Sequence, residues 1–252
     1  MTLSDSLYRE AVRLKKEKRP EEALIVIGLA IEHNPDNYDY WNVKAMILDD
    51  LNRFEEACEF YDRAYELSGL NVIRLNKARS LYRWAKRLHF PGGEYEKALT
   101  TVNDALLISP NEKEYWFLKG EILEGMGDLI SARKAYYRAE GEDEKLEGLE
   151  NQLDLFEQYT NYSLINITGT SFYKGLEPFK DGTVVDLVRE PSNEHDPEAV
   201  RVEIDGETVG YVANSDHTVI DGVIRAGELT DSNKRAEVLM IYLGELVIAR
   251  LI

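Results

Sequence analysis

The stretch from Arg189 to Val212 reads REPSNEHDPEAVRVEIDGETVGYV. Its second half alternates apolar and charged residues on either side of Asp205-Gly206. An Asp-Gly pair between two alternating runs is typical of a β-hairpin with a two-residue turn. We therefore expect strands at 199–204 and 207–213. The proline-containing loop at 190–197 precedes them, and loops that a rigid scaffold holds in shape commonly carry binding residues.

The same alternation continues through the C-terminal part of the chain. It predicts further strands at 164–168, 183–189, 236–242 and 245–251. A helix is expected at 215–226, because Val219, Ile220, Val223 and Ile224 recur at helical spacing. Six short strands with one helix favour a closed or partly open β-barrel.

The N-terminal part repeats itself with a period of 34 residues: Ala23 and Ala30 recur as Ala57 and Ala64. This pattern resembles the tetratricopeptide repeat, whose unit is a pair of antiparallel helices. We expect repeats at about 4–37, 38–70, 71–112 and 113–144, followed by an amphipathic helix at 145–158 that caps them. The predicted fold class is α+β, with a solenoid at 1–158 and a barrel at 159–252.

The loop and hairpin together resemble the HIRAN domain, a small β-barrel module. The positions that fit are Arg189, Glu190, Pro191, Asn193, Asp196, Ala199, Val200, Val202, Gly206, Gly210, Tyr211 and Val212. An upstream aromatic motif, from Gly169 to Gly175, fits as well. The resemblance covers residues from about 164 to 252.

That resemblance implies recognition of a single-stranded DNA end whose 3′-hydroxyl sits in a pocket. Phe172 and Tyr173 would stack on the terminal bases, and Asp196 would read the end. The other residues expected at the site are Lys174, Asn193, His195 and Tyr211. The chain departs from the DNA-binding examples of the family at three positions, which carry Ser171 for an arginine, His195 for a tyrosine, and Tyr211 for a histidine. In the alternative interpretation, Phe172 and Tyr173 belong to the core and Asp196 only caps a turn.

The net charge of −17 repels duplex DNA, so any nucleic-acid contact has to come from a local site. A single cysteine, Cys58, fits a reducing compartment, and we expect a cytoplasmic protein. No apolar run approaches the length that spans a membrane, so no membrane partner is expected.

The third repeat is longer than the others and carries the basic residues Arg74, Lys77, Arg79, Arg83, Lys86 and Arg87. These residues either neutralise acidic neighbouring repeats or pack on a second subunit, or they dock an acidic peptide or nucleic-acid backbone. The resemblance places a protein-binding groove at Tyr8, Asn42, Met46, Arg79, Tyr82, Arg83 and Phe117. The lysine and asparagine set with which some of these repeats hold a C-terminal carboxylate is not present.

No catalytic pattern stands out. The histidines His33, His89, His195 and His217 have no metal-ligand spacing, and no cofactor is expected. The sequence therefore predicts a non-enzymatic adaptor whose repeats hold an unidentified protein and whose barrel recognises DNA ends during repair or replication. The alternatives are a pure protein-interaction scaffold and, with less support, a metal-dependent nuclease. The oligomeric state stays open.

Overall fold

The computed structural model describes residues 2–215, 218–220, 222–232, 234–244 and 246–252. The chain forms two compact units that divide between Leu146 and Glu147. Each unit is built from its own kind of secondary structure, and each is described by itself.

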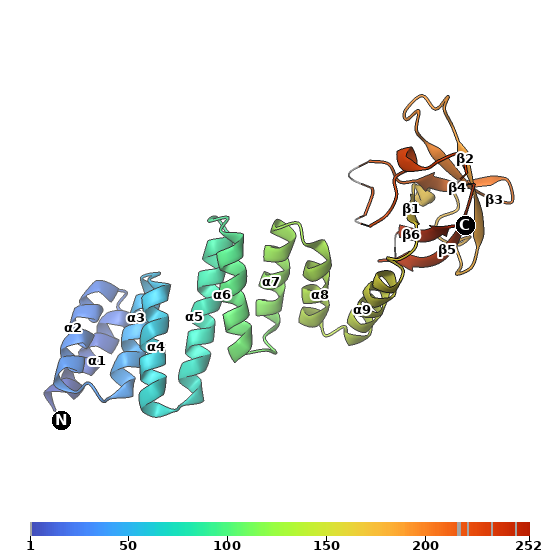
Figure 1. Cartoon of the computed structure of the whole chain (residues 1–252). Coiled ribbons are helices and arrows are strands. Elements are labelled where there is room, and N and C mark those ends of the chain that lie inside the picture. The colour runs from blue at the N-terminus through green and yellow to red at the C-terminus, as the bar shows by residue number, and fades with distance from the viewer. Residues whose placement is uncertain (1, 216–217, 221, 233, 245) are drawn as a thin grey trace. The chain divides into compact units, whose positions relative to one another are not determined.

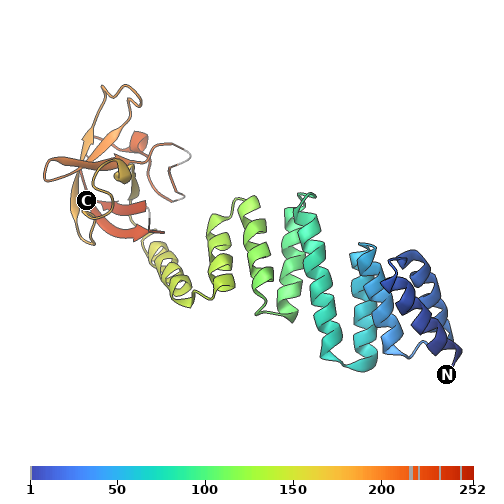
Figure 2. The same ribbon diagram turned by 180° about the vertical axis from the view of Figure 1, so that it is seen from behind.

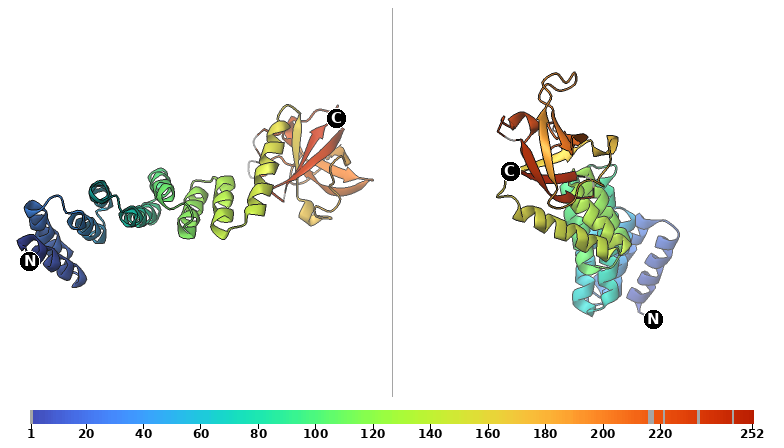
Figure 3. Two further views of the ribbon diagram at one scale, coloured as in Figure 1. Left: turned by 90° about the horizontal axis from the view of Figure 1, so that it is seen from below. Right: turned by 90° about the vertical axis from the view of Figure 1, so that its right-hand side faces the viewer.

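The first unit consists of helices in antiparallel pairs, which confirms the predicted repeats. Figures 1 and 3 show the pairs stacked one after another along the unit. The helices are α1 (Leu3–Lys16), α2 (Pro20–His33), α3 (Tyr38–Asp50), α4 (Phe54–Ser68), α5 (Asn71–His89), α6 (Tyr95–Ile108), α7 (Lys113–Gly125) and α8 (Leu129–Glu140).

The repeat period determines how these helices pack. The alanines at the repeated positions are fully buried, which lets paired helices approach closely. Two tryptophans at equivalent positions make the same contact. The indole of Trp41 donates to the carbonyl of Pro35, and that of Trp116 donates to the carbonyl of Pro110, each at 2.7 Å. These bonds fix the turn that precedes α3 and the turn that precedes α7.

The second unit contains a closed antiparallel barrel with the strand order β1-β4-β3-β2-β5-β6. Figure 2 shows its strands from behind. The strands are β1 (Leu164–Thr168), β2 (Val184–Arg189), β3 (Val200–Ile204), β4 (Glu207–Val212), β5 (Arg235–Tyr242) and β6 (Leu246–Leu251). Alternate residues of these strands fill the interior, among them Ile165, Ile167, Val185, Val202, Val238 and Val247. The predicted strands are thus confirmed, apart from Glu245, which lies outside the described residues.

The β3–β4 hairpin turns at the predicted dipeptide. Asp205 and Gly206 have φ angles of 53° and 80°, as this type of turn requires. Ile204 pairs with Glu207 across the turn, and a bulge follows at Val202/Glu203. The hairpin thereby carries β4 back beside the loop at 190–197.

The helix predicted at 215–226 is wrong for the residues of that range that the structure describes, since only Ala226 enters a short 3₁₀ helix there, Ala226–Glu228. Gly222 has a φ of +86°, which an α-helix does not accommodate. The Ile224 amide donates to the Leu164 carbonyl at 2.7 Å, so this part of the segment bonds to the barrel, while the amides of Thr218 and Val219 donate to the Ser215 carbonyl. Asp216, His217 and Asp221 lie outside the described residues.

The helix predicted at 145–158 is present as α9 (Asp143–Gln158). Its residues Leu153 and Phe156 pack against a cluster that includes Leu164, Tyr242 and Ile248 of the barrel. The predicted role as a cap of the repeats therefore needs correction for these two residues. The sequence places the domain boundary at 158/159, whereas the compact units divide inside α9.

Candidate functional site

A pocket of about 420 Å³ opens on the barrel where the loop at 190–197 meets β1 and β4. It brings together five of the seven residues predicted to contact DNA. The lining residues are Thr168, Tyr173, Asn193, His195, Asp196, Ala199, Tyr211, Val212, Asn214, Ser215 and Thr218.

Glu190 fastens the loop to the barrel. Its Oε2 accepts hydrogen bonds from Asn193 Nδ2 at 3.1 Å and from the Tyr211 hydroxyl at 3.0 Å. Its Oε1 pairs with the Arg201 guanidinium. The hydrogen bond from Asn193 lowers the pKa of Glu190, and those from Tyr211 and Arg201 add to the effect. The carboxylate therefore stays ionised and joins the loop to β3 and β4.

The tip of the loop is held by its own side chains. Asn193 Oδ1 accepts from the backbone amides of His195 at 3.0 Å and Asp196 at 3.2 Å. Asp196 Oδ1 accepts from the Glu198 amide at 2.9 Å, so Asp196 caps a turn as one interpretation expected. These bonds give the loop one shape and fix where Asp196 lies.

Asn214 was not predicted. Its side-chain amide donates to Asp196 Oδ2 at 3.0 Å, and its Oδ1 accepts from the Gly227 amide at 3.1 Å. A carboxylate oxygen carries two lone pairs, so each oxygen of Asp196 has the capacity for one more donor. Asp196 is thus a turn cap that can also accept a ligand hydroxyl.

The aromatic pair faces solvent, which contradicts the interpretation that places both rings in the core. Phe172 is 87% exposed and Tyr173 is 43% exposed. The rings of Tyr173 and Tyr211 lie 6.3 Å apart with an angle of 43° between their planes. Burial raises the pKa of Tyr211, and the neighbouring Tyr173 and Glu190 raise it further. The Tyr211 hydroxyl therefore stays protonated and donates to Glu190.

Two predicted residues lie outside the set of described residues that line this pocket. Phe172 projects from the 3₁₀ helix Thr170–Phe172, and Lys174 forms an exposed ion pair with Glu207. Of the predicted aromatic residues, Tyr173 and Tyr211 therefore line the pocket, and Phe172 precedes Tyr173 in the sequence.

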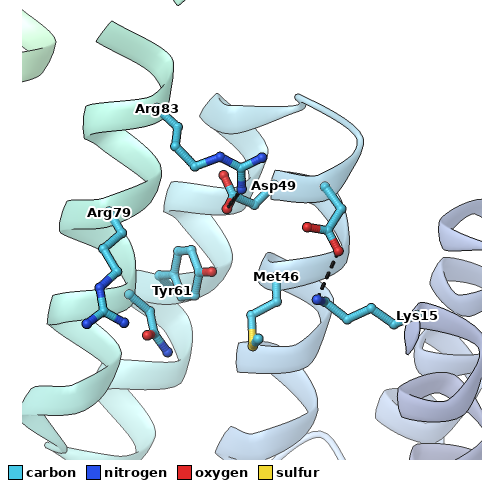
Figure 4. Close-up of a pocket in the computed structure, with 8 residues that line it drawn as sticks. Lys15, Met46, Asp49, Tyr61, Arg79 and Arg83 are labelled. Carbon is cyan, nitrogen blue, oxygen red and sulfur yellow. Dashed lines mark hydrogen bonds and ion pairs between the residues drawn. The ribbon is translucent and has the colours of Figure 1, made fainter. Parts of the chain in front are cut away.

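The repeat unit has a pocket of its own, of about 260 Å³, between α1, α3, α4 and α5 (Figure 4). It is lined by Lys15, Met46, Asp49, Asp50, Tyr61, Asn76, Arg79 and Arg83, three of which were predicted for the groove. Asn42, a fourth, accepts a hydrogen bond from Asn76 at 3.2 Å.

The charges of this pocket are mostly paired. Asp49 is buried, accepts from the Ser80 hydroxyl at 2.8 Å and pairs with Arg83. Burial raises the pKa of Asp49 despite these two partners. Lys15 pairs with Asp50 at 2.9 Å. Arg79 is exposed and has no ion-pair partner among the described residues, so it is open to an external anion.

The other predicted groove residues lie elsewhere on the repeat unit. Tyr8 stacks on Tyr40 with 5.3 Å between ring centres, and Tyr82 stacks on Tyr115 at 4.9 Å. Phe117 is 42% exposed. The structure therefore does not bring these three residues into the pocket that contains Arg79.

The described residues contain no cluster of histidine, cysteine, aspartate and glutamate that could hold a metal ion. Burial raises the pKa of the Cys58 thiol to about 11, so it stays protonated. In the part of the chain that the structure covers, each helix is too short or too polar to cross a bilayer.

Comparison with known proteins supports this architecture. The family model of the HIRAN domain matches residues 161–236. The tetratricopeptide repeat model matches residues 38–69 and 113–145. Tetratricopeptide repeats indicate protein binding, and a HIRAN domain indicates DNA binding in general.

Curated relatives match half or more of the chain. "TPR repeat-containing protein MJ1428" of Methanocaldococcus jannaschii is 31% identical over 127 residues, which are 50% of this chain and 21% of that protein. "Anaphase-promoting complex subunit 3" of Schizosaccharomyces pombe is 30% identical over 168 residues, 64% of this chain and 23% of that protein. The chain thus spans under a quarter of the length of either relative.

Among solved structures, "Crystal structure of MamA" has a TM-score of 0.43 and 17% identity, and the match covers 57% of this chain and 80% of that one.

The HIRAN match overlaps β1 to β4 and the loop at 190–197, and the repeat matches overlap α3, α4, α7 and α8. The chain is therefore a tetratricopeptide repeat protein with a C-terminal HIRAN domain.

Proposed function

We propose that the protein is a non-catalytic adaptor that acts in DNA repair or replication in the cytoplasm. Its barrel binds the 3′ end of single-stranded DNA, and its repeats hold a protein partner. The proposal that the barrel binds DNA ends is supported by one observation: Tyr173, Asp196 and Tyr211 line the same open pocket.

The chemistry of the pocket suits the terminus of a DNA strand better than its phosphate backbone. The described lining includes no lysine or arginine, and the chain as a whole is anionic. Phosphate attraction therefore supplies little affinity, and base stacking on exposed aromatic rings, about 1–3 kcal/mol per base, has to supply most of it. A 3′-hydroxyl can donate to Asp196, whereas a 3′-phosphate is repelled by it.

The test compares labelled single strands that end in a 3′-hydroxyl with strands that end in a 3′-phosphate. Fluorescence anisotropy at low and physiological salt measures the affinities. We expect the hydroxyl end to bind more tightly, and Tyr173→Ala to weaken binding. Tyr162→Ala removes a ring of similar exposure from outside the pocket lining and serves as the control. Equal binding of both ends, or none, leaves the alternative of a protein-interaction scaffold.

Asp196→Asn tests end recognition while it keeps the turn bond of the loop. Its single amide oxygen can accept from the Glu198 amide, whereas its amide nitrogen is a donor and cannot accept from Asn214 as Oδ2 does. Removing the charge should narrow the preference for the hydroxyl end by improving the affinity for the phosphate end. An unchanged preference rules out Asp196 as the group that reads the end.

The repeat pocket supports the second part of the proposal. Arg79 offers an unpaired guanidinium beside the apolar Met46 and the amides of Asn42 and Asn76. This combination suits an acidic peptide segment, because guanidinium groups bind carboxylates through two donors. We expect Arg79→Glu to lose protein partners in a pull-down, and Arg87→Glu, which makes the same charge change outside this pocket, to retain them. An unchanged set of partners would count against the pocket.

The absence of strand cleavage with Mg²⁺ or Mn²⁺ is also expected. Cleavage that depends on either ion would contradict a non-catalytic role.

A further inference from the structure

The repeat unit has a second groove, of about 510 Å³, that shares no lining residue with the pocket in Figure 4. Helices α4, α5 and α6, which stand side by side in Figure 1, form it. Its walls are acidic and its floor is apolar, and neither sequence pattern nor the proposed function accounts for this combination.

The acidic wall is a stripe along α4. Glu55, Glu59 and Asp62 recur at spacings of four and three residues, so they share one face of the helix. Asp104 of α6 adds a fourth carboxylate from the opposite side. Lys77 neutralises Asp62, with its Nζ 2.6 Å from both carboxylate oxygens.

Three of these carboxylates are therefore unpaired: Glu55, Glu59 and Asp104 have no ion-pair partner among the described residues. The nearby Lys97 places its ammonium 5.1 Å from the centre of the Trp84 ring. Even with Lys97 included, carboxylates outnumber ammonium groups two to one around the groove. A low-dielectric floor strengthens the field that these carboxylates exert on a bound cation.

The floor supplies apolar surface next to these charges. Leu81 and Trp84 of α5 contribute to it, together with Ile108 of α6. Leu107, at the rim, is 80% exposed. Single exposed leucines are common on protein surfaces, but Leu107 adjoins a groove with an apolar floor, where a partner side chain can bury it.

We infer that this groove docks a basic amphipathic segment of a partner protein. Apolar side chains of the segment pack on Leu107 and Trp84, and its lysines or arginines meet Glu55, Glu59 and Asp104. Helical peptides that bind in grooves present their anchors at spacings of three and four residues, which matches the stripe on α4. Nucleic acids and anionic lipid surfaces are excluded as occupants by the charge of the walls.

The experiment uses the full chain and a labelled synthetic peptide that carries leucines at helical spacing and lysines between them. A peptide of the same composition in scrambled order is the comparison. Fluorescence anisotropy should show tighter binding of the ordered peptide. The double variant Glu59→Lys/Asp104→Lys, one change in each wall, should weaken its binding about tenfold.

Net charge is controlled by Glu147→Lys/Asp154→Lys, which makes the same charge change at exposed positions of α9. This variant should change the affinity by less than about twofold, because screening limits the effect of distant charges. Leu107→Ser should also weaken binding about tenfold, since burial of a leucine side chain contributes roughly 1.5–3 kcal/mol. Ile25→Ser, at a position that is 67% exposed on α2, should have no effect.

Three outcomes would overturn the inference: the two charge variants weaken binding equally, Leu107→Ser leaves it unchanged, or both peptides bind alike. Sedimentation of the free chain tests whether a second copy occupies the groove, and self-association that Leu107→Ser abolishes also overturns it. If the wall variant does not fold, Leu107→Ser decides alone, because its side chain is already in water.

Discussion

The hydroxyl of Tyr211 lies 3.0 Å from Oε2 of Glu190, to which it donates a hydrogen bond. The two residues are 21 positions apart, and the bond ties the loop at 190–197 to β4. The same oxygen accepts from Asn193, whose own side chain shapes the turn at Asp196. Glu190 is thus a positioning residue for the pocket, although it does not line it.

We expect Glu190→Gln to loosen this loop. The amide that replaces one carboxylate oxygen is a donor, so it cannot accept from both Arg201 and Tyr211 as the carboxylate does. The loss of one or two such bonds should lower the free energy of unfolding by about 1–3 kcal/mol. Urea denaturation followed by far-UV circular dichroism measures this free energy. An unchanged free energy of unfolding would show that the hydrogen-bond network of Glu190 contributes nothing to stability.

The stability that Glu190 contributes should also depend on pH. Its pKa in the folded chain is lowered from the ordinary value of 4.5. A lowered pKa means that the contribution is present above the unfolded pKa and is lost as the pH falls through the folded value. The difference in stability between the native chain and Glu190→Gln should therefore shrink below about pH 4.5. A constant difference down to the lowest accessible pH would contradict the assignment.

Asp49 should behave in the opposite way. Burial raises its pKa above the ordinary value of 3.8, so its contribution to stability is present below that value and is lost as the pH rises through the folded pKa. At neutral pH the ionised carboxylate therefore opposes folding. At pH 7 the repeat unit of Asp49→Asn should be as stable as that of the native chain or more stable. This difference in stability should decline toward pH 4.

The control for Asp49 is Asp36→Asn, at an exposed position for which no hydrogen bond or ion pair is seen among the described residues. Thermal unfolding at several pH values compares the two variants. A marked loss of stability in Asp49→Asn at pH 7 would show that the bonds to Ser80 and Arg83 outweigh the cost of burial.

Gly210 of β4 has no room for a side chain. A Cβ atom there would lie 2.8 Å from Ile167 Cγ2 and 2.9 Å from the Thr168 carbonyl oxygen, because β4 runs close against β1. Gly210→Ala should destabilise the barrel by about 1–3 kcal/mol. Gly148 of α9 meets nothing within 4 Å, so Gly148→Ala should stabilise its helix by about 0.5–1 kcal/mol. Thermal unfolding of both variants checks that Gly210→Ala lowers stability and that Gly148→Ala raises it.

Phe172 allows function to be separated from stability. Because its side chain is 87% exposed, Phe172→Ala should change the free energy of unfolding by less than about 0.5 kcal/mol. If the ring stacks on a base, the same variant should weaken binding of single-stranded DNA by about 1–3 kcal/mol. Unchanged DNA affinity would remove Phe172 from the site and leave Tyr173 as the stacking residue.

The fold could be predicted from the sequence where a local pattern specifies the structure. Asp205-Gly206 specifies its turn through backbone conformation alone, and the buried alanines mark each helix pair through their period. The segment 215–226 shows the limit of such reasoning. Ile220 and Val223 have helical spacing, yet they pack against the barrel cluster near Tyr242, and periodicity does not reveal which surface an apolar residue will meet.

The candidate sites were predictable to different degrees. The loop motif brought Asn193, His195 and Asp196 into one pocket, because these residues lie within a few positions of one another. Asn214 follows β4 in a segment without a recognisable pattern, so its bond to Asp196 depends on the folded barrel. In the repeats, by contrast, a signal was available, since both Asn42–Asn76 and Asp49–Arg83 are pairs separated by 34 residues.

The closed strand order of the barrel restricts how it can meet a partner. Each described strand has a neighbour on both sides, so the sheet presents no open edge to which an incoming peptide could add as a further strand. Whatever the barrel binds must be recognised through side chains and loop atoms. Its specificity can therefore be altered residue by residue, during evolution or by design, without breaking the ladder of main-chain bonds that holds it together.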